Sequence, residues 1–336
     1  MNILYTCDDK FCAYTGISIT SLFENNTELG EINVFIAGQD ISDENNLKLS
    51  KTAEKYGRNI TLLDADKVDK FLVENNAVSY HESKAPYYRL FLDELLPETI
   101  DRVLYIDSDT IIVGSLAKLE TFVFEPDKVC AMKRDPVFAE HKTSIGLSGD
   151  DIYYHSGVML FALDKWRKLK CSDMLIREIR AGRANYRLPD QDLLSRALNK
   201  NIQALDLKYN FLTHIPYYGI NTYRAISDAV DGTYYSVEQM QDAIDNPVIL
   251  HCVRGFVGTP WEKGNTNPFK AEWTKYKEMS LWSDIGEAPC RTGGLMAVQR
   301  VLFKILPKKL YISLHKYYSK KRHLRIVGNQ ETSAVR

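Results

Sequence analysis

The sequence predicts an α/β domain whose mixed, mostly parallel sheet is flanked by helices, with a basic helical tail at the C-terminus. Strand and helix patterns alternate along the first two-thirds of the 336 residues. Residues 103–106 form a continuous apolar run, which is typical of a strand buried on both faces. The C-terminal region differs in charge from everything before it. These three observations favour one large α/β domain followed by an appendage.

The expected strands cover residues 3–5, 32–36, 60–63, 103–106, 128–132, 158–162 and 247–250. Between the second and third strands, Ser42 is the expected N-cap of a helix over residues 43–56. Further helices are expected over 85–96, stopped by Pro97, and over 164–180, closed by Gly182. Another begins near Pro189, a residue suited to the first helical turn. This order indicates repeated βαβ units.

Charge divides the chain into an expected domain over 1–285 and a tail over 286–336, with the boundary in a Gly- and Pro-containing stretch near 283–296. From residue 288 onward there are eleven Lys or Arg and one acid. That segment carries +10, so the rest carries −11 of the formal net charge of −1. The body therefore needs cations of its own, and the tail favours anionic surfaces. No nucleic-acid partner is expected.

The tail has helical apolar periodicity. Its first stripe, ended by Pro307, contains Val298, Val301, Leu302, Ile305 and Leu306, and its second contains Leu310, Leu314, Tyr317 and Tyr318. One interpretation is a helix pair that binds anionic membranes, and the other is a basic helix packed back on the domain.

No apolar run is long enough to span a bilayer. The six scattered cysteines indicate reduced thiols rather than a zinc site. We therefore expect a cytoplasmic protein, peripheral on the inner face of the plasma membrane.

The most informative motif is Asp107-Ser108-Asp109, directly after the apolar strand over 103–106. The carboxyl ends of strands in open α/β sheets border the ligand crevice, so two carboxylates are expected where a substrate lies. Mn²⁺ or Mg²⁺ accepts carboxylate and phosphate oxygens together, which makes this pair a natural bridge to a diphosphate. The last expected strand ends on a further metal-capable residue, His251.

Several segments together resemble glycosyltransferase family 8, and most closely its bacterial galactosyl- and glucosyltransferases for surface polysaccharides. The matching segments are 3–11 (ILYTCDDKF), 87–90 (YYRL), 103–109 (VLYIDSD), 153–158 (YYHSGV), 189–192 (PDQD), 208–211 (KYNF), and His251 with Pro260-Trp261. The resemblance covers roughly residues 1–280. It implies a GT-A fold and a retaining, metal-dependent enzyme that transfers a hexose from a UDP-sugar to a lipopolysaccharide, capsular or other glycan or glycolipid acceptor.

The resemblance also implies roles for individual residues. Asp107, Asp109 and His251 would hold Mn²⁺ or Mg²⁺, and Asp190 and Gln191 would face the reacting sugar. Gln191 is a poor nucleophile, so front-face substitution is favoured over a covalent sugar intermediate. The other implied donor-site residues are Thr6, Asp8, Lys10, Arg89, Ser108, Asp135, Ser156, Arg254, Gly255 and Lys263.

Two departures from the family pattern affect the donor site. The segment from His251 to Trp261 is two residues longer than the family's His-x-x-Gly-x-x-Lys-Pro-Trp, and Thr259 replaces its lysine. Arg254 or Lys263 is then expected to meet the diphosphate. Ser156 replaces a common asparagine at the donor sugar, which leaves galactose and glucose both open.

Two other classes compete with this interpretation. Asp107-Ser108-Asp109-Thr110 also fits the Asp-x-Asp-x-Thr motif of haloacid-dehalogenase-type phosphatases, with Asp107 as nucleophile. That motif normally opens its domain, whereas three expected strands precede it here. A non-catalytic sugar-nucleotide-binding protein is the second alternative, and it has no need to keep the acids and Gln191.

Overall fold

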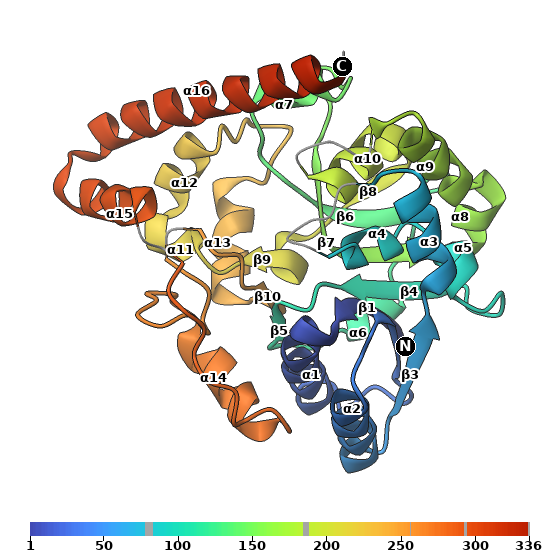
Figure 1. The fold of residues 1–336 in the computed structure, drawn as a ribbon. Helices are drawn as coiled ribbons and strands as arrows, with labels where there is room; N and C mark the ends of the chain where they lie inside the picture. Colours follow the sequence, from blue (N-terminus) through green and yellow to red (C-terminus); the bar gives the residue numbers. More distant parts are fainter. Residues whose placement is uncertain (78–82, 184–187, 256, 292–293, 335–336) are drawn as a thin grey trace.

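The computed structural model describes residues 1–77, 83–183, 188–255, 257–291 and 294–334. Its main sheet has seven strands in the order β3-β2-β1-β4-β7-β6-β8 (Figure 1). These strands are β1 (Asn2–Asp8), β2 (Asn33–Gln39), β3 (Asn59–Asp64), β4 (Arg102–Ile106), β6 (Cys130–Arg134), β7 (Tyr154–Ala162) and β8 (Ile202–Leu205). A second sheet, in the order β5-β10-β9, consists of β5 (Thr110–Ile112), β9 (Phe211–Leu212) and β10 (Ile249–His251).

The pairing confirms a mixed, mostly parallel main sheet. β1 pairs in parallel with β2 and β4, β2 with β3, and β6 with β8. β7 is antiparallel to both β4 and β6. All seven expected strands correspond to observed ones, although β7 begins earlier than expected and β10 belongs to the second sheet.

Helices precede, connect and follow the strands (Figure 1). In the first half they are α1 (Asp9–Glu24), α2 (Asp43–Tyr56), α3 (Asp66–Glu74), α4 (Ala85–Tyr88), α5 (Leu92–Leu95), α6 (Ala117–Glu120), α7 (Ala139–Ser144), α8 (Leu163–Leu169) and α9 (Cys171–Arg180). In the second half they are α10 (Pro189–Leu198), α11 (Ile215–Tyr218), α12 (Ile220–Ile226), α13 (Val237–Asp245), α14 (Lys270–Met279), α15 (Leu295–Ile305) and α16 (Lys308–Ala334). Two short 3₁₀ helices are η2 (Asn199–Asn201) and η3 (Leu207–Asn210).

Helices cover both faces of the main sheet, which explains its continuous apolar strands. Val103 and Tyr105 of β4 pack in a core with side chains of α3 to α5 and α8 to α10. Leu104 and Ile106 point to the other face, where α1, α2 and α6 pack. Because side chains alternate along a strand, a strand buried on both sides needs apolar residues at consecutive positions.

Two helices expected as single elements are each divided, and those expectations were wrong. The segment over 85–96 forms α4 and α5, joined by turns in which the Leu90 and Phe91 amides bond carbonyls three residues back. Its apolar residues lie on all sides rather than in one stripe, and the turns bury them together. The segment over 164–180 breaks at Lys170, which is left-handed with φ 57°, and this lets Trp166 and Leu175 both reach the core.

The tail forms α15 and α16, and α16 runs over α12 and α7 at one side of the molecule (Figure 1). Phe303 and Tyr311 are buried in a small cluster with Ile226 of α12. Val301 and Ile305 of the first stripe are exposed, as are Val298, Leu310, Tyr317 and Tyr318. The tail therefore packs on the body through one face and presents other apolar side chains outward. Among the described residues, no helix is long and apolar enough to cross a membrane.

Candidate functional site

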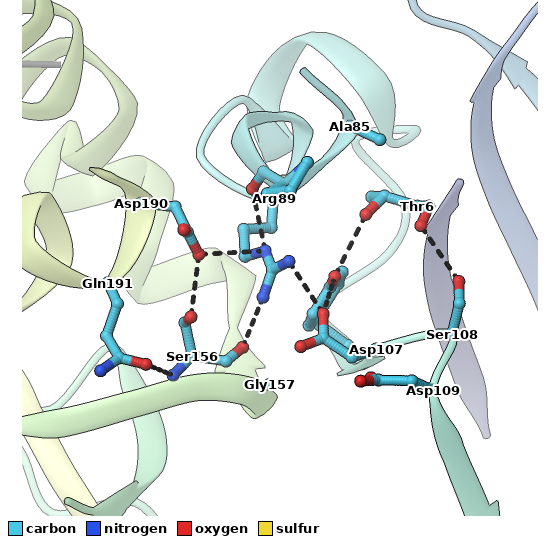
Figure 2. Close-up of polar contacts among 12 residues, drawn as sticks. Thr6, Ala85, Arg89, Asp107, Ser108, Asp109, Ser156, Gly157, Asp190 and Gln191 are labelled. Atoms are coloured by element: carbon cyan, nitrogen blue, oxygen red, sulfur yellow. Dashed lines mark hydrogen bonds and ion pairs between the residues drawn. The ribbon is translucent and has the colours of Figure 1, made fainter. Parts of the chain in front are cut away.

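The Asp-Ser-Asp motif lies at the carboxyl end of β4, between the two sheets. The Asp107 amide donates to the Gly157 carbonyl of β7 at 2.8 Å, which continues the pairing of β4 with β7. The Ser108 hydroxyl donates to the Thr6 carbonyl of β1 at 3.2 Å (Figure 2). Thr110 then begins β5 of the second sheet. The motif is thus fixed from both neighbouring strands at the point where the chain leaves the main sheet.

His251 reaches the same place from the second sheet. It ends β10, where it pairs with Thr110 of β5. Its Nε2 lies 3.0 Å from Oδ1 of Asp109 and 3.7 Å from Oδ2 of Asp107. One ligand atom from each of the three residues lies within 4.8 Å of the others. Residues 144 positions apart in the chain therefore form one potential metal site.

The residues around this cluster fit a divalent cation. Asn210 Oδ1 lies 2.9 Å from His251 Nδ1, so Nδ1 carries the hydrogen and Nε2 is left to face the two carboxylates. Gly157 supplies the space beside it. A Cβ on Gly157 would lie 2.2 Å from His251 Cε1 and 2.8 Å from Asp107 Oδ2. The imidazole tautomer, the two carboxylates and the missing side chain all suit a cation held by oxygen and nitrogen.

Electrostatics couple the three groups. Burial raises the pKa of Asp107, although the nearby Arg89 and His251 oppose this. Burial alone would lower the pKa of His251, but the Asp109 and Asp107 carboxylates outweigh it and raise this pKa above its ordinary value. Burial would also raise the pKa of Asp109, yet the charge and hydrogen bond of His251 hold it below its usual range. The two carboxylates thus favour a positive charge beside them, and a divalent cation held by the three groups would supply that charge.

Arg89 joins the metal cluster to a second acid, Asp190. Its Nη2 lies 2.8 Å from Asp107 Oδ1, and its Nε lies 3.6 Å from Asp190 Oδ2 (Figure 2). Its Nη1 donates to the Ser156 carbonyl at 2.7 Å, and the guanidinium lies 4.1 Å from the Tyr105 ring centroid. All three guanidinium nitrogens therefore have protein partners, and Arg89 acts as a buried bridge between the two carboxylates.

Asp190 and Gln191 open α10 and point toward β7 (Figure 2). The Ser156 hydroxyl donates to Asp190 Oδ2 at 2.8 Å, and the Ser156 amide donates to Gln191 Oε1 at 3.2 Å. The Gln191 amide nitrogen donates to Asp135 Oδ2 at 3.5 Å. Asp135, Ser156, Asp190 and Gln191 thus form one connected polar group, as the sequence-based assignment to a common site requires.

The remaining predicted site residues are less closely joined to this group. Thr6 contacts the Tyr105 hydroxyl, which in turn donates to Asp107. Asp8 caps α1 by accepting from the Phe11 amide, and Lys10 is exposed in the first turn of that helix. Their expected contact with uridine stays a prediction.

The two basic candidates for the diphosphate occupy different environments. Arg254 donates to the buried carboxylate of Glu262 at 2.9 Å, whereas Lys263 is exposed. Gly255 adopts a positive φ of 44°, and a Cβ there would lie 3.3 Å from His214. Which basic residue meets the diphosphate stays a prediction.

Sequence reasoning assigned no role to Asn210, Gly157 or Lys133. Asn210 and Gly157 lie in segments that resemble the family, but only the tertiary structure shows that they contact His251. The sequence did contain one signal for Lys133. A lysine that continues an apolar strand is expected to be buried, and a buried lysine needs a charged or polar partner.

Comparison with known proteins identifies the fold and the class. The structure of LgtC, solved as an active-site variant with glutamine replaced by glutamate, matches with a TM-score of 0.69 at 22% identity, covering 84% of this chain and 96% of that one. The fold is accordingly the GT-A fold, as predicted. The family model for glycosyl transferase family 8 matches residues 2–263. The chain belongs to this family and is a glycosyltransferase.

Two curated relatives align over most of their lengths. General stress protein A of Bacillus subtilis (strain 168) is 26% identical over 287 residues, which is 85% of this chain and 96% of that protein. The lipopolysaccharide 1,2-glucosyltransferase of Escherichia coli (strain K12) is 25% identical over 320 residues, covering 93% of this chain and 87% of the relative. The second alignment extends into the tail, because it is longer than the part of the chain that precedes residue 286.

Proposed function

We propose that this glycosyltransferase moves a hexose, glucose or galactose, from a UDP-sugar to a lipopolysaccharide, capsular or other glycan acceptor, with a divalent cation and with retention of the anomeric configuration. One observation carries the proposal. His251 of the second sheet converges on the Asp107 and Asp109 carboxylates, and Arg89 connects that cluster to Asp190 beside Gln191. A cation site and a sugar-facing pair are thus joined within one buried network.

The donor site follows from these contacts. Asp107, Asp109 and His251 would hold Mn²⁺ or Mg²⁺, which when bound supplies positive charge to the leaving diphosphate. Asp190 is oriented by Ser156 and Arg89, and its carboxylate can accept hydrogen bonds from sugar hydroxyls. The glutamine replaced in the LgtC variant belongs to that protein's active site, and Gln191 is the corresponding kind of residue in this site.

Given retention, which the resemblance to the family implies, the weak nucleophilicity of an amide argues against a double displacement through a covalent intermediate. Because Gln191 is a poor nucleophile, we infer that the acceptor hydroxyl enters on the face from which the diphosphate leaves. The bond from the acceptor oxygen to the anomeric carbon forms, the bond from that carbon to the β-phosphate oxygen breaks, and the acceptor proton passes to the phosphate. Gln191 would stabilise the positively charged sugar ring through its amide dipole.

The tail supports attachment to an anionic membrane at the inner face of the plasma membrane. Its exposed apolar side chains include Val301, Ile305 and Leu310, and exposed lysines lie among them at 304, 308 and 309. Two other tail lysines are engaged with the body, since Lys316 pairs with Asp228 at 2.8 Å and Lys320 pairs with Glu140. We propose that the exposed apolar and basic face meets the bilayer while the opposite face holds the body.

The two competing classes are less well supported. A phosphatase would need the Asp107 carboxylate as a nucleophile, yet Oδ1 of this group accepts a hydrogen bond from Tyr105 and pairs with Arg89. The family match also argues for glycosyl transfer. A non-catalytic binding protein would have no need of the buried arrangement around Asp190 and Gln191.

A donor screen tests the proposal. The full chain is incubated with UDP-glucose, UDP-galactose and GDP-mannose, with Mn²⁺ or with EDTA, and nucleotide release and the melting temperature are measured. We expect Mn²⁺-stimulated release from one of the UDP-hexoses and thermal stabilisation by UDP with Mn²⁺. Since no acceptor is present, NMR of the hexose released by hydrolysis, recorded before mutarotation, should show the α configuration of the donor. Turnover that EDTA leaves unchanged, or an inverted product, would contradict the assignment.

A further inference from the structure

Lys133 is a fully buried lysine beside the proposed site. It lies on β6, and its Nζ is 2.8 Å from Oδ1 of Asp135, two residues further along the chain. Its side chain is 0% exposed. A folded protein is often no more stable with a buried ion pair than with apolar residues of the same size in its place. Its presence next to Asp135 therefore indicates a purpose other than stability.

Asp135 connects this lysine to Gln191. Its second oxygen, Oδ2, accepts from the Gln191 side-chain nitrogen at 3.5 Å, while the Gln191 oxygen accepts from the Ser156 amide at 3.2 Å. A side-chain amide has one donor end and one acceptor end. The charged carboxylate requires the donor end, and the backbone amide requires the acceptor end. The two neighbours therefore select the same orientation of the Gln191 amide.

Lys133 is the cation that compensates Asp135. In the described part of the chain, the charge of Asp135 also helps to raise the pKa of three phenols, those of Tyr153, Tyr223 and Tyr234. Burial is the main cause that raises the pKa of each phenol, so all three stay neutral near pH 7. Without the ammonium, Oδ1 of the Asp135 carboxylate would lose the partner that orients the group, and Oδ2 would no longer be held toward the Gln191 nitrogen.

We propose that Lys133 is a positioning residue of the transfer reaction: it holds one oxygen of the Asp135 carboxylate, keeps the other directed at Gln191, and thereby helps to fix the direction of the Gln191 amide dipole. The proposal rests on the function proposed above. Lys133 contacts neither sugar nor cation in this role, so its removal should affect the chemical step and leave donor binding nearly intact. A dipole held at both ends costs no reorganisation when charge develops on the sugar, whereas an amide held only by the Ser156 amide keeps more freedom to reorient.

The first test compares Lys133→Met with Lys128→Met, which removes a surface lysine that bonds the Lys200 carbonyl away from the site. With whichever UDP-hexose the wild type hydrolyses, Lys133→Met should lower kcat about 10- to 100-fold and change KM for the donor by less than about threefold. Lys128→Met should match wild type throughout. Wild-type kcat in Lys133→Met, or a rise in donor KM with kcat unchanged, would overturn the proposal.

The second test is a double-mutant cycle that does not require the single lysine variant to fold. Asp135→Asn and Lys133→Met/Asp135→Asn are compared, and the double variant contains neither buried charge. If Lys133 acts only through Asp135, the two variants should have the same kcat within about twofold. A further loss in the double variant would mean that Lys133 acts directly, and the proposal would fall. Wild-type protein without any Mn²⁺-dependent UDP-sugar turnover would refute the proposed function instead.

Discussion

Replacing Gly157 with alanine should disable the proposed metal site through one added methyl group. The new Cβ would lie 2.2 Å from His251 Cε1, whereas ordinary van der Waals contact begins near 3.4 Å. The imidazole or the strand must therefore shift by about 1 Å, and a misplacement of that size can cost roughly 100-fold in rate. Asp107 Oδ2, at 2.8 Å from the new atom, would be displaced as well. We expect kcat/KM for the UDP-sugar to fall at least about 100-fold.

Thermal unfolding separates this local effect from a loss of fold. Overpacking costs about 1–3 kcal/mol, so Gly157→Ala should melt a few degrees lower than wild type. The stabilisation that Mn²⁺ with UDP gives the wild type should nearly vanish in the variant, because binding to the native state is what raises the melting temperature. Gly149→Ala is the matched control, since a Cβ at that position would have nothing within 4 Å. Wild-type Mn²⁺ stabilisation and turnover in Gly157→Ala would refute the assigned metal site.

Three further outcomes are expected. His251→Ala should abolish Mn²⁺-dependent turnover. Asn210→Ala should weaken Mn²⁺ binding in a titration about 10- to 100-fold, because the imidazole of His251 loses the partner that orients it. Equal Mn²⁺ affinity in the wild type and both variants would contradict this. Gln191→Ala should lower kcat about 100-fold with UDP affinity nearly unchanged, and a parallel loss of UDP binding would indicate a structural role instead. Ile305→Asp should reduce co-sedimentation with phosphatidylserine vesicles and leave donor hydrolysis unchanged, whereas Val123→Asp, also exposed but on the body, should bind vesicles like wild type.

Local patterns in the sequence were sufficient to predict many of the helices and strands and the position of the Asp-Ser-Asp motif. The Ser42 cap with helix 43–56 and the apolar run over 103–106 follow from nearest-neighbour chemistry, and the structure contains both. Helices over 85–96 and 164–180 were wrongly expected to be continuous. The breaks allow these segments to pack against the sheet, and a short stretch of sequence holds no information about that packing. The sequence left open whether the tail packs on the domain, and the structure shows Phe303, outside the predicted stripe, buried while Val301 and Ile305 within it are exposed.

The sequence by itself determined the chemistry that is available: two carboxylates at the end of a buried strand, a histidine at the end of another, and an acid-amide pair at the start of a helix. Only the tertiary structure decided which of these groups meet. His251 reaches Asp109 because β10 pairs with β5 in a second sheet, and Lys133 is linked to Gln191 through Asp135 because β6 and α10 both border β7. Such contacts depend on strand order and register between distant segments, and the periodicity of a single segment contains information on neither.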